Sequence, residues 1–220
     1  MIRFLLFLLM LSVTSAASAQ GVIVLQDKPF AYMPVRDTAL WNRLLSNPGF
    51  GSLSAIEQDF FYWTNLMRMN PARFEETVLK EFLKQFPEAN SPDSRSLTAD
   101  LKTTQANLPF LEPDKGLFVM ASTHATDLKG RNGIISHQSS TGKDFVQRIK
   151  EKGKYRCGAE NVFVGTPEAL EALILLLIDK GVKDKGHRKN LLSPTFTLMG
   201  ASFKEMSNKK AVLVQDFGCK

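Results

Sequence analysis

Three histidines are the residues in this sequence best suited to catalysis or metal binding: His124, His137 and His187. His124 shares the apolar face of a predicted helix, three residues before Asp127, so we expect it to point inward. His137 lies in a stretch typical of an exposed loop, and His187 lies in a short basic segment. No two of them have the i, i+4 spacing of a helical metal motif. Taken singly, each histidine is more consistent with a structural or surface role.

The acidic and nucleophilic candidates are few. Glu160 comes just before a predicted strand, where a sheet edge can hold a carboxylate toward a cleft, although alone it is more typical of a surface charge. Asp179 alone is typical of a helix end. No Ser or Cys is obviously placed as a nucleophile, and Ser136 is the nearest candidate.

The two cysteines, Cys157 and Cys219, both follow the N-terminal segment. In an exported protein, two thiols predict one intramolecular disulfide, which here would tie the terminal strand to the core. A nucleophilic Cys157 is the alternative. No Cys-His signature surrounds it, and oxidising conditions disfavour a free thiol.

The first 19 residues predict a secretory signal peptide. Arg3 precedes an apolar run that is shorter than the ~20 residues needed to cross a bilayer, and Ala17 and Ala19 fit a signal-peptidase site. An uncleaved membrane anchor is the alternative. Cleavage removes one arginine and no acid, so the net charge falls from +6 to +5. We expect a secreted or periplasmic protein that is not integral to the membrane.

The composition is that of an ordinary globular domain. With 220 residues, 44% hydrophobic and 23% charged, the chain forms one modest domain or two very small ones, and is not disordered, collagen-like or disulfide-dense. The apolar stretch over residues 172–178 is too short to span a membrane and predicts a buried helix. Basic residues are scattered among acids and no nucleic-acid motif is present, so we expect no nucleic-acid partner.

Capping signals and hydrophobic periodicity divide the chain into elements. Residues 20–53 predict an irregular N-terminal extension with one helical patch at 38–45. A capping box at Ser54 and Glu57 opens a helix that runs to about residue 69, and Asn70-Pro71 starts a second one to about residue 86. Residues 87–107 are polar with two prolines and predict a surface loop.

The second half predicts helices around a small sheet. A third helix opens at Pro113-Asp114, a short basic helix spans residues 144–151, and Thr166-Pro167 begins an apolar fourth helix. Residues 161–164 predict a strand, and residues 197–204 and 211–217 predict a hairpin with its turn at Ser207-Asn208. The expected fold class is α+β, with helices flanking a small antiparallel sheet.

Six segments, taken in order, resemble the CAP superfamily of cysteine-rich secretory, antigen 5 and pathogenesis-related proteins, in its bacterial exported branch. They are Asn65-Leu-Met-Arg68, His124-Ala-Thr-Asp127, Ser136-His137 with Gly142, Gly158-Ala-Glu-Asn161, Gly186-His-Arg-Lys-Asn190 and Met199-Gly200. Single segments are weak signals, whereas their order and spacing are fairly specific. The resemblance therefore predicts a CAP domain over residues 54–220.

The resemblance implies a three-layer α/β/α sandwich with a central cleft that holds two histidines and two acids. By position, the histidines are His137 and His187, and the first acid is Glu160. Asp179 is the candidate for the second acid, where many members have glutamate and exported bacterial members often have none. We expect supporting roles for His124, Asp127, Ser136, Asn161 and Arg188.

Three kinds of function remain open for this cleft. Two neutral imidazoles and a carboxylate suit Zn²⁺ or another divalent cation, with Glu160 as a ligand or as the acceptor that fixes a histidine tautomer. Family members are also associated with lipids, sterols and cell-surface partners, so a non-catalytic binding module is the alternative. The residues could instead form a buried hydrogen-bonded network that holds the cleft together. We expect a monomer.

Overall fold

A computed structural model of the chain describes residues 25, 28–32 and 34–220. The predicted signal peptide, residues 1–19, lies outside the described residues. In the described part of the chain, no helix is long and apolar enough to cross a membrane.

The centre of the fold is a four-stranded sheet in the order β1-β3-β4-β2. Strands β3 (Leu198–Glu205) and β4 (Ala211–Cys219) form the predicted hairpin, and β2 (Cys157–Gly165) pairs antiparallel with β4. Strand β1 (Glu112–Pro113) adds two residues parallel to β3. Strand β2 is thus an edge strand, and Glu160 lies inside it instead of before it, because β2 begins at Cys157.

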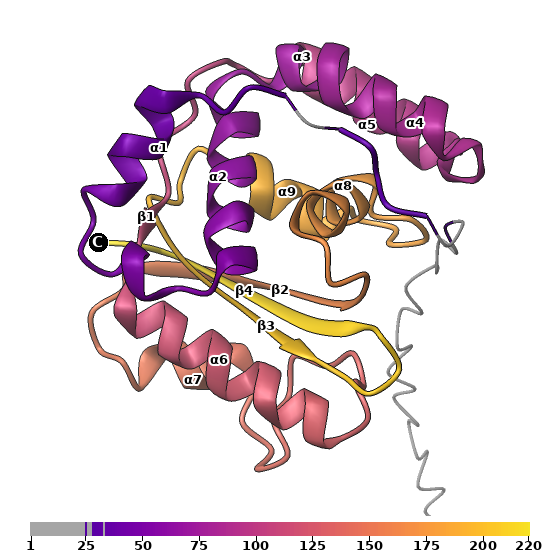
Figure 1. The fold of residues 1–220 in the computed structure, drawn as a ribbon. Helices are drawn as coiled ribbons and strands as arrows, with labels where there is room; N and C mark the ends of the chain where they lie inside the picture. Colours follow the sequence, from indigo (N-terminus) through magenta and orange to yellow (C-terminus); the bar gives the residue numbers. More distant parts are fainter. Residues whose placement is uncertain (1–24, 26–27, 33) are drawn as a thin grey trace, which may run out of the picture.

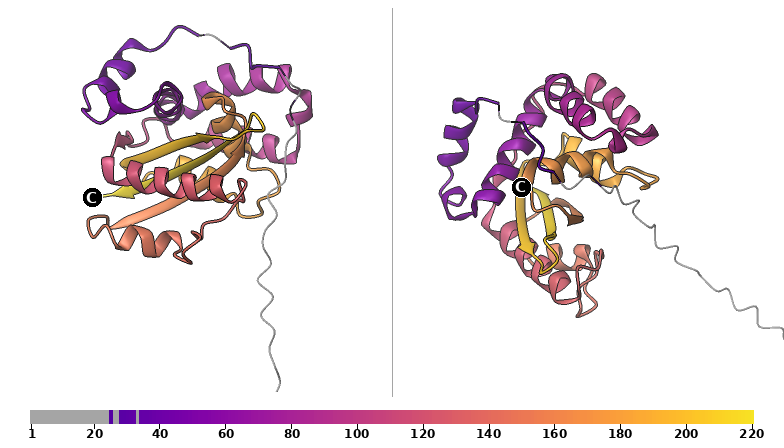
Figure 2. Two further views of the ribbon diagram at one scale, coloured as in Figure 1. Left: turned by 60° about the horizontal axis from the view of Figure 1, so that its bottom comes forward. Right: turned by 45° about the vertical axis from the view of Figure 1, so that its right-hand side comes forward.

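Helices cover both faces of the sheet, which confirms the α+β sandwich (Figure 1). On one face lie α2 (Ala55–Met69), α8 (Ala169–Ile178) and α9 (Gly186–Leu192). On the other face lie α6 (Lys115–Gly130) and α7 (Phe145–Lys150), and Figure 2 shows α6 crossing the strands. The described residues also form the helices α1 (Thr38–Leu45), α3 (Pro71–Phe74), α4 (Lys80–Gln85) and α5 (Pro92–Thr103).

Strand alternation sorts the side chains between the two layers. Val162 and Val214 pack with Ala125 and other residues of α6, whereas Leu213 and Phe217 join the larger core on the opposite face. Even-numbered residues of β2 and β4 therefore face α6, and odd-numbered ones face α2 and α8. The neighbours Glu160 and Asn161 must point to opposite faces of the edge strand.

Helix α6 approaches the sheet closely at Gly200 on β3. A Cβ placed on Gly200 would overlap the backbone of Leu117 and Phe118. Glycine is needed here because the helix backbone occupies the space of a side chain. This contact fixes the height of α6 above the strands, and so the position of His124, two turns further along.

Several predicted element boundaries are confirmed. The capping box at Ser54 and Glu57 starts α2, Asn70 caps α3 with Pro71 in the first turn, and Asp144 caps α7. Helices α3 and α4 form one run through a π-helical turn (Glu75–Leu79). Helix α1 occupies the helical patch of the N-terminal extension, where Leu40 and Leu44 are buried in the main core.

Two predictions are wrong, and one helix was missed. Residues 87–107 are not a loop, because Ser91 caps α5 with Pro92 in its first turn, and Leu97 and Leu101 are buried. Helix α8 begins at Ala169 after Glu168, and Thr166 accepts only one backbone hydrogen bond before it. Helix α9 was not predicted, because it has only seven residues and follows a left-handed residue.

The predicted disulfide joins Cys157 and Cys219, whose Cα atoms lie 5.3 Å apart at opposite positions on β2 and β4. It ties the last strand to the sheet edge. The alternative of a free, nucleophilic Cys157 is therefore wrong.

Candidate functional site

Glu160 is the centre of a polar cluster on the α6 face of the sheet. Its Oε1 lies 2.9 Å from His137 Nδ1, and its Oε2 accepts a hydrogen bond from Arg148 on α7. The Glu160 side chain is almost fully buried, whereas 55% of the His137 side chain is exposed. Since a carboxylate can only accept, Nδ1 of His137 carries a hydrogen. Nε2 is thus the ring nitrogen that does not face Glu160.

Arg148 fixes the loop that carries His137. Its Nη1 donates to the carbonyl oxygens of His137 and Lys143, at 2.9 and 3.1 Å, while Nη2 binds Glu160. One guanidinium therefore holds both the backbone of His137 and the carboxylate that orients its ring. Sequence reasoning placed Arg148 only in a short basic helix. Its sequence context gave no further signal, because Arg148 is one of two basic residues in the last turn of α7.

His124 supports the same loop from α6. Its Nε2 donates to the carbonyl oxygen of Ser136 at 2.9 Å and lies 3.9 Å from Glu160 Oε1. The predicted inward orientation is confirmed, since His124 is 1% exposed. Burial lowers its pKa, against the opposing effect of Glu160, so the ring is neutral with its hydrogen on Nε2. The Ser136 hydroxyl is engaged with Gln138, not with a base.

Asp216 on β4 lies directly opposite Glu160 on β2, and it is fully buried. Burial, followed by the negative charge of Glu160, raises the Asp216 pKa well above its usual range. Ionising two adjacent buried carboxyl groups together costs a large free energy. Sequence reasoning missed this residue. The available signal was the pair Gln215-Asp216, because two polar residues interrupt an apolar strand and point to opposite faces of the sheet.

His187 makes the second imidazole–carboxylate pair, with Asp179. Its Nδ1 lies 2.7 Å from Asp179 Oδ1, and its backbone N–H donates to Asp179 Oδ2 at 3.0 Å. Asp179 ends α8 in the left-handed conformation, with φ 53°, which aspartate tolerates better than most residues. The turn directs its carboxylate at the start of α9. Asp179 therefore orients His187 as Glu160 orients His137.

A chain of amides connects the two pairs through β2. Asn161 accepts a hydrogen bond from Asn190 at 2.8 Å and donates to Gln215 at 2.9 Å. Its Nδ2 also lies 3.5 Å from the carbonyl oxygen of His187. Because Asn161 follows Glu160 directly, adjacent residues of one edge strand hold the two histidine-bearing segments from opposite faces.

The remaining supporting residues have structural contacts. Arg188 is buried and donates to α8 carbonyls and to Asp100 and Ser96 on α5, so it binds three helices together. Asp127 accepts from Arg131 and from the backbone of Ser140, which shapes the loop after α6.

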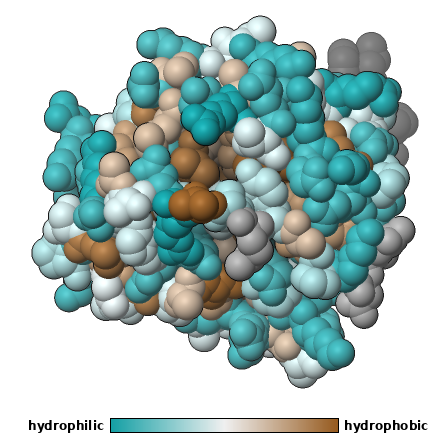
Figure 3. Space-filling model, turned by 45° about the horizontal axis from the view of Figure 1, so that its top comes forward, coloured by the Kyte–Doolittle hydropathy of each residue, from teal (hydrophilic) through white to brown (hydrophobic). Residues whose placement is uncertain are grey.

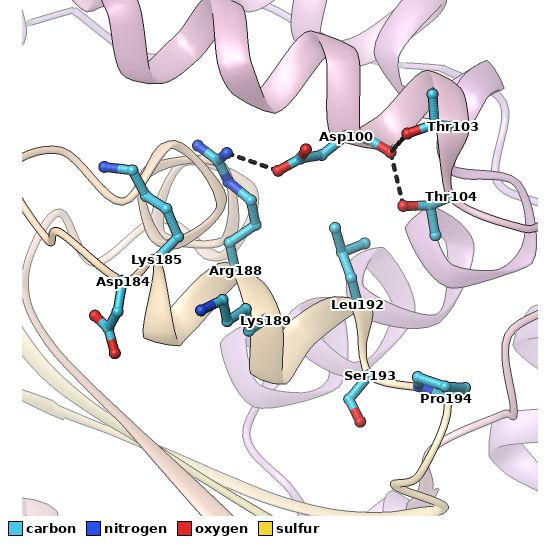
Figure 4. Close-up of a pocket in the computed structure, with 10 residues that line it drawn as sticks. All are labelled: Asp100, Thr103, Thr104, Asp184, Lys185, Arg188, Lys189, Leu192, Ser193 and Pro194. Atoms are coloured by element: carbon cyan, nitrogen blue, oxygen red, sulfur yellow. Dashed lines mark hydrogen bonds and ion pairs between the residues drawn. The ribbon is translucent and has the colours of Figure 1, made fainter.

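A pocket of about 520 Å³ lies between α5 and α9; its lining includes Lys185 and Arg188, which flank His187, but neither member of either imidazole–carboxylate pair. Figure 4 shows Arg188 reaching from α9 to Asp100, so its charge is already paired. Its lining residues are Asp100, Thr103, Thr104, Asp184, Lys185, Arg188, Lys189, Leu192, Ser193 and Pro194. The face drawn in Figure 3 is mostly hydrophilic, with hydrophobic residues in small separate areas.

The fit of a metal to these side chains is partial. Among the described residues, no group of three or more His, Cys, Asp or Glu has the arrangement of a metal site. Glu160 does not fit the role of a ligand, because its two oxygens face His137 and Arg148. The two histidines fit better, since a metal-binding imidazole commonly directs its other nitrogen at a carboxylate.

Comparisons with known proteins place this geometry in context. The chain is 32% identical over 98 residues to the uncharacterized protein YkwD of Bacillus subtilis (strain 168), an alignment that covers 43% of this chain and 35% of that protein. A structure of an extracellular protein containing an SCP domain from Bacillus anthracis has 24% identity and a TM-score of 0.45, covering 60% of this chain and 44% of that one.

An outer surface protein from Borrelia burgdorferi has 23% identity and a TM-score of 0.44, covering 52% of this chain and 80% of that one. The family described as CAP, the cysteine-rich secretory protein family, matches residues 65–217. This match includes both imidazole–carboxylate pairs and all four strands of the sheet up to residue 217. The chain therefore belongs to the CAP family.

Proposed function

We propose that this protein is an exported CAP-domain protein in which His137 and His187 bind a divalent cation through their Nε2 atoms. The observation that carries the proposal is the shared arrangement of the two rings, each with Nδ1 within 2.9 Å of a carboxylate oxygen. A carboxylate in this position fixes the tautomer and raises the basicity of the opposite nitrogen.

The proposal assigns Glu160 and Asp179 as acceptors that orient the ligands, instead of as ligands. Imidazole nitrogen suits Zn²⁺, Cu²⁺ and Ni²⁺, and two protein nitrogens leave coordination positions for water or for a ligand. A bound cation would supply Lewis acidity, which polarises a carbonyl or lowers the pKa of bound water. The chain's own contribution is to orient each imidazole through a carboxylate at its Nδ1, with the His137 side chain 55% exposed and the His187 side chain 10% exposed.

Export is supported by the disulfide and by the family description. Disulfides form and persist in secreted and periplasmic proteins, where the surroundings are oxidising. The protein would then meet its cation outside the cytoplasm.

Calorimetric titration of the purified mature protein with zinc chloride tests the proposal. We expect about one Zn²⁺ per chain near neutral pH, with weaker binding in acid, where protons compete for the imidazole nitrogens. His137→Ala and His187→Ala should each abolish this binding. Unchanged affinity in both variants would reject the assignment.

His124→Gln is the matched control, because it removes the third histidine while keeping a donor for the Ser136 carbonyl. Zinc binding should persist in it. The alternative function, a non-catalytic module for lipid, sterol or a cell-surface component, predicts a bound lipid in an organic extract of the purified protein and no specific zinc uptake.

A further inference from the structure

Two carboxyl groups face each other across neighbouring strands beneath His137. Glu160 on β2 and Asp216 on β4 are register partners in the antiparallel sheet, so their side chains lie on the same face. Exposure is 7% for Glu160 and 0% for Asp216. The third strand contributes no side chain here, because the β3 partner of Asp216 is Gly200.

The two carboxyls differ in their donors. Glu160 faces His137, Arg148 and, at longer distance, His124. In contrast, no donor among the described residues reaches either oxygen of Asp216. Arg148 is the charged group near the pair from α7, and its Nη2 is directed at Glu160. A buried carboxylate without a donor is strongly unfavourable, whereas a buried carboxylic acid needs only one acceptor.

Protonation of Asp216 resolves this imbalance. Its O–H then becomes the missing donor, and Glu160 across the strand pair is the acceptor within reach. Burial and the charge of Glu160 act in the same direction, since both raise the Asp216 pKa. One proton shared between two carboxyls is the usual solution when two such groups meet in a dry site.

We propose that Asp216 is a positioning residue: it keeps a proton at neutral pH and donates it to Glu160, which stays fixed as the acceptor for His137 Nδ1. Glu160 then has three donors from three elements, namely His137 in the loop, Arg148 on α7 and Asp216 on β4. This network determines which nitrogen of His137 faces solvent. The inference deepens the proposed function, because its importance rests on His137 acting as a ligand.

The test uses the metal-free full chain and reads the ring directly. The carbon-13 shift of the Asp216 carboxyl, followed against pH by NMR, should show no ionisation near pH 4 and a protonated group at pH 7. Nitrogen-15 shifts of His137 should show the neutral ring protonated on Nδ1. An Asp216 carboxyl that titrates like an exposed aspartate would overturn the proposal.

Two substitutions separate the hydrogen bond from packing. Asp216→Asn keeps a donor of the same shape and should preserve the His137 tautomer, whereas Asp216→Leu removes the donor and should shift the ring toward the Nε2-protonated form. Val214→Ala, on the same face of β4, creates a cavity without removing a donor and should leave the tautomer unchanged. An unchanged His137 tautomer in a folded Asp216→Leu variant would contradict the proposal.

If Asp216→Leu does not fold, two measurements still test the role of Asp216. They are the titration of the Asp216 carboxyl in the native chain and the His137 tautomer in the Asp216→Asn variant. Zinc calorimetry on the same proteins decides the proposed function separately. Suppose that the Asp216→Leu variant loses the Nδ1-protonated tautomer of His137 and that the native chain binds no zinc. That result would support Asp216 as a positioning residue and reject the cation site.

Discussion

Glu160 receives donors from several elements, and this explains why it orients a ring instead of coordinating a cation. Hydrogen bonds to charged groups contribute about 1.5–3 kcal/mol each, so a cation would have to displace Arg148 or His137 at that cost. In each histidine pair one ring nitrogen faces the carboxylate. The proposed cation site therefore assigns coordination to the imidazoles and orientation to the carboxylates.

His124 should make folding stability depend on pH. Burial lowers its folded-state pKa below the unfolded value of ~6.5, so the unfolded chain binds a proton that the folded chain excludes. The stabilisation is fully present above that value and is lost as pH falls toward the folded-state pKa. The expected loss is up to about 1.4 kcal/mol per pH unit within this window.

Urea unfolding at pH 7.5 and pH 5.5 measures the free energy of unfolding of the native chain and of the His124→Gln variant. The variant keeps a donor for the Ser136 carbonyl but does not titrate, so the native chain should lose more stability than the variant between the two conditions. An equal loss in both proteins would show that His124 is not the titrating group.

Sequence patterns located His124, His137 and His187, but not the contacts that give them roles. Glu160 and Asp179 were assigned to the site only through the family resemblance, because each alone is typical of a surface or helix-end residue. Arg148 and Asp216 were missed for a physical reason: a basic residue in a basic helix and an acid in an apolar strand acquire partners only through tertiary packing. Register across β2 and β4 cannot be read from either strand alone.

At the scale of elements, close packing of α6 on β3 positions His124 over Glu160. Replacing Gly200 by alanine should lower the free energy of unfolding by about 3 kcal/mol, because the added Cβ meets the helix backbone, which cannot rotate away as a side chain does. Chemical denaturation measures the change. Since the clash lifts the first turns of α6, zinc affinity should fall as well.

Gly51→Ala is the matched control. No atom lies within 4 Å of the position of its added Cβ, so its effect on stability should stay within about 0.5 kcal/mol. Equal effects of the two substitutions would mean that α6 does not pack as described.

Helices whose first turn carries a capping residue could be predicted from the sequence, and helices that depend on tertiary packing could not. Ser54, Asn70 and Asp144 are capping residues whose hydrogen bonds form within one turn, so sequence alone located the starts of three helices. Helix α5 is mostly polar because only a narrow strip, with Leu97 and Leu101, faces the core. Helix α9 depends on its neighbours, since Arg188 and the Asp179 turn hold it in place.

At the scale of the molecule, β2 joins the two helical layers, because its neighbouring residues bind the α6 face and the α9 face. Whatever holds β2 at the sheet edge therefore holds both histidines. One end of β2 pairs with the last residues of β4, where Cys157 and Cys219 are covalently joined. The other end runs into the loop before α8. The disulfide thus secures the end of β2 that lies nearest to Glu160.

Removing the disulfide should destabilise the whole molecule and loosen this edge. The bond closes a loop of sequence separation 62, for which the chain-entropy model gives about 4 kcal/mol. Urea unfolding of the Cys157→Ser/Cys219→Ser variant should show a loss of about 2–4 kcal/mol, and amide exchange should accelerate at residues 157–160 before residues 163–165. Reductant should bring the native chain to the stability of the variant and leave the variant unchanged. If reductant does not shift the native transition, the bond contributes nothing to holding β2, and the position of Glu160 depends on strand pairing alone.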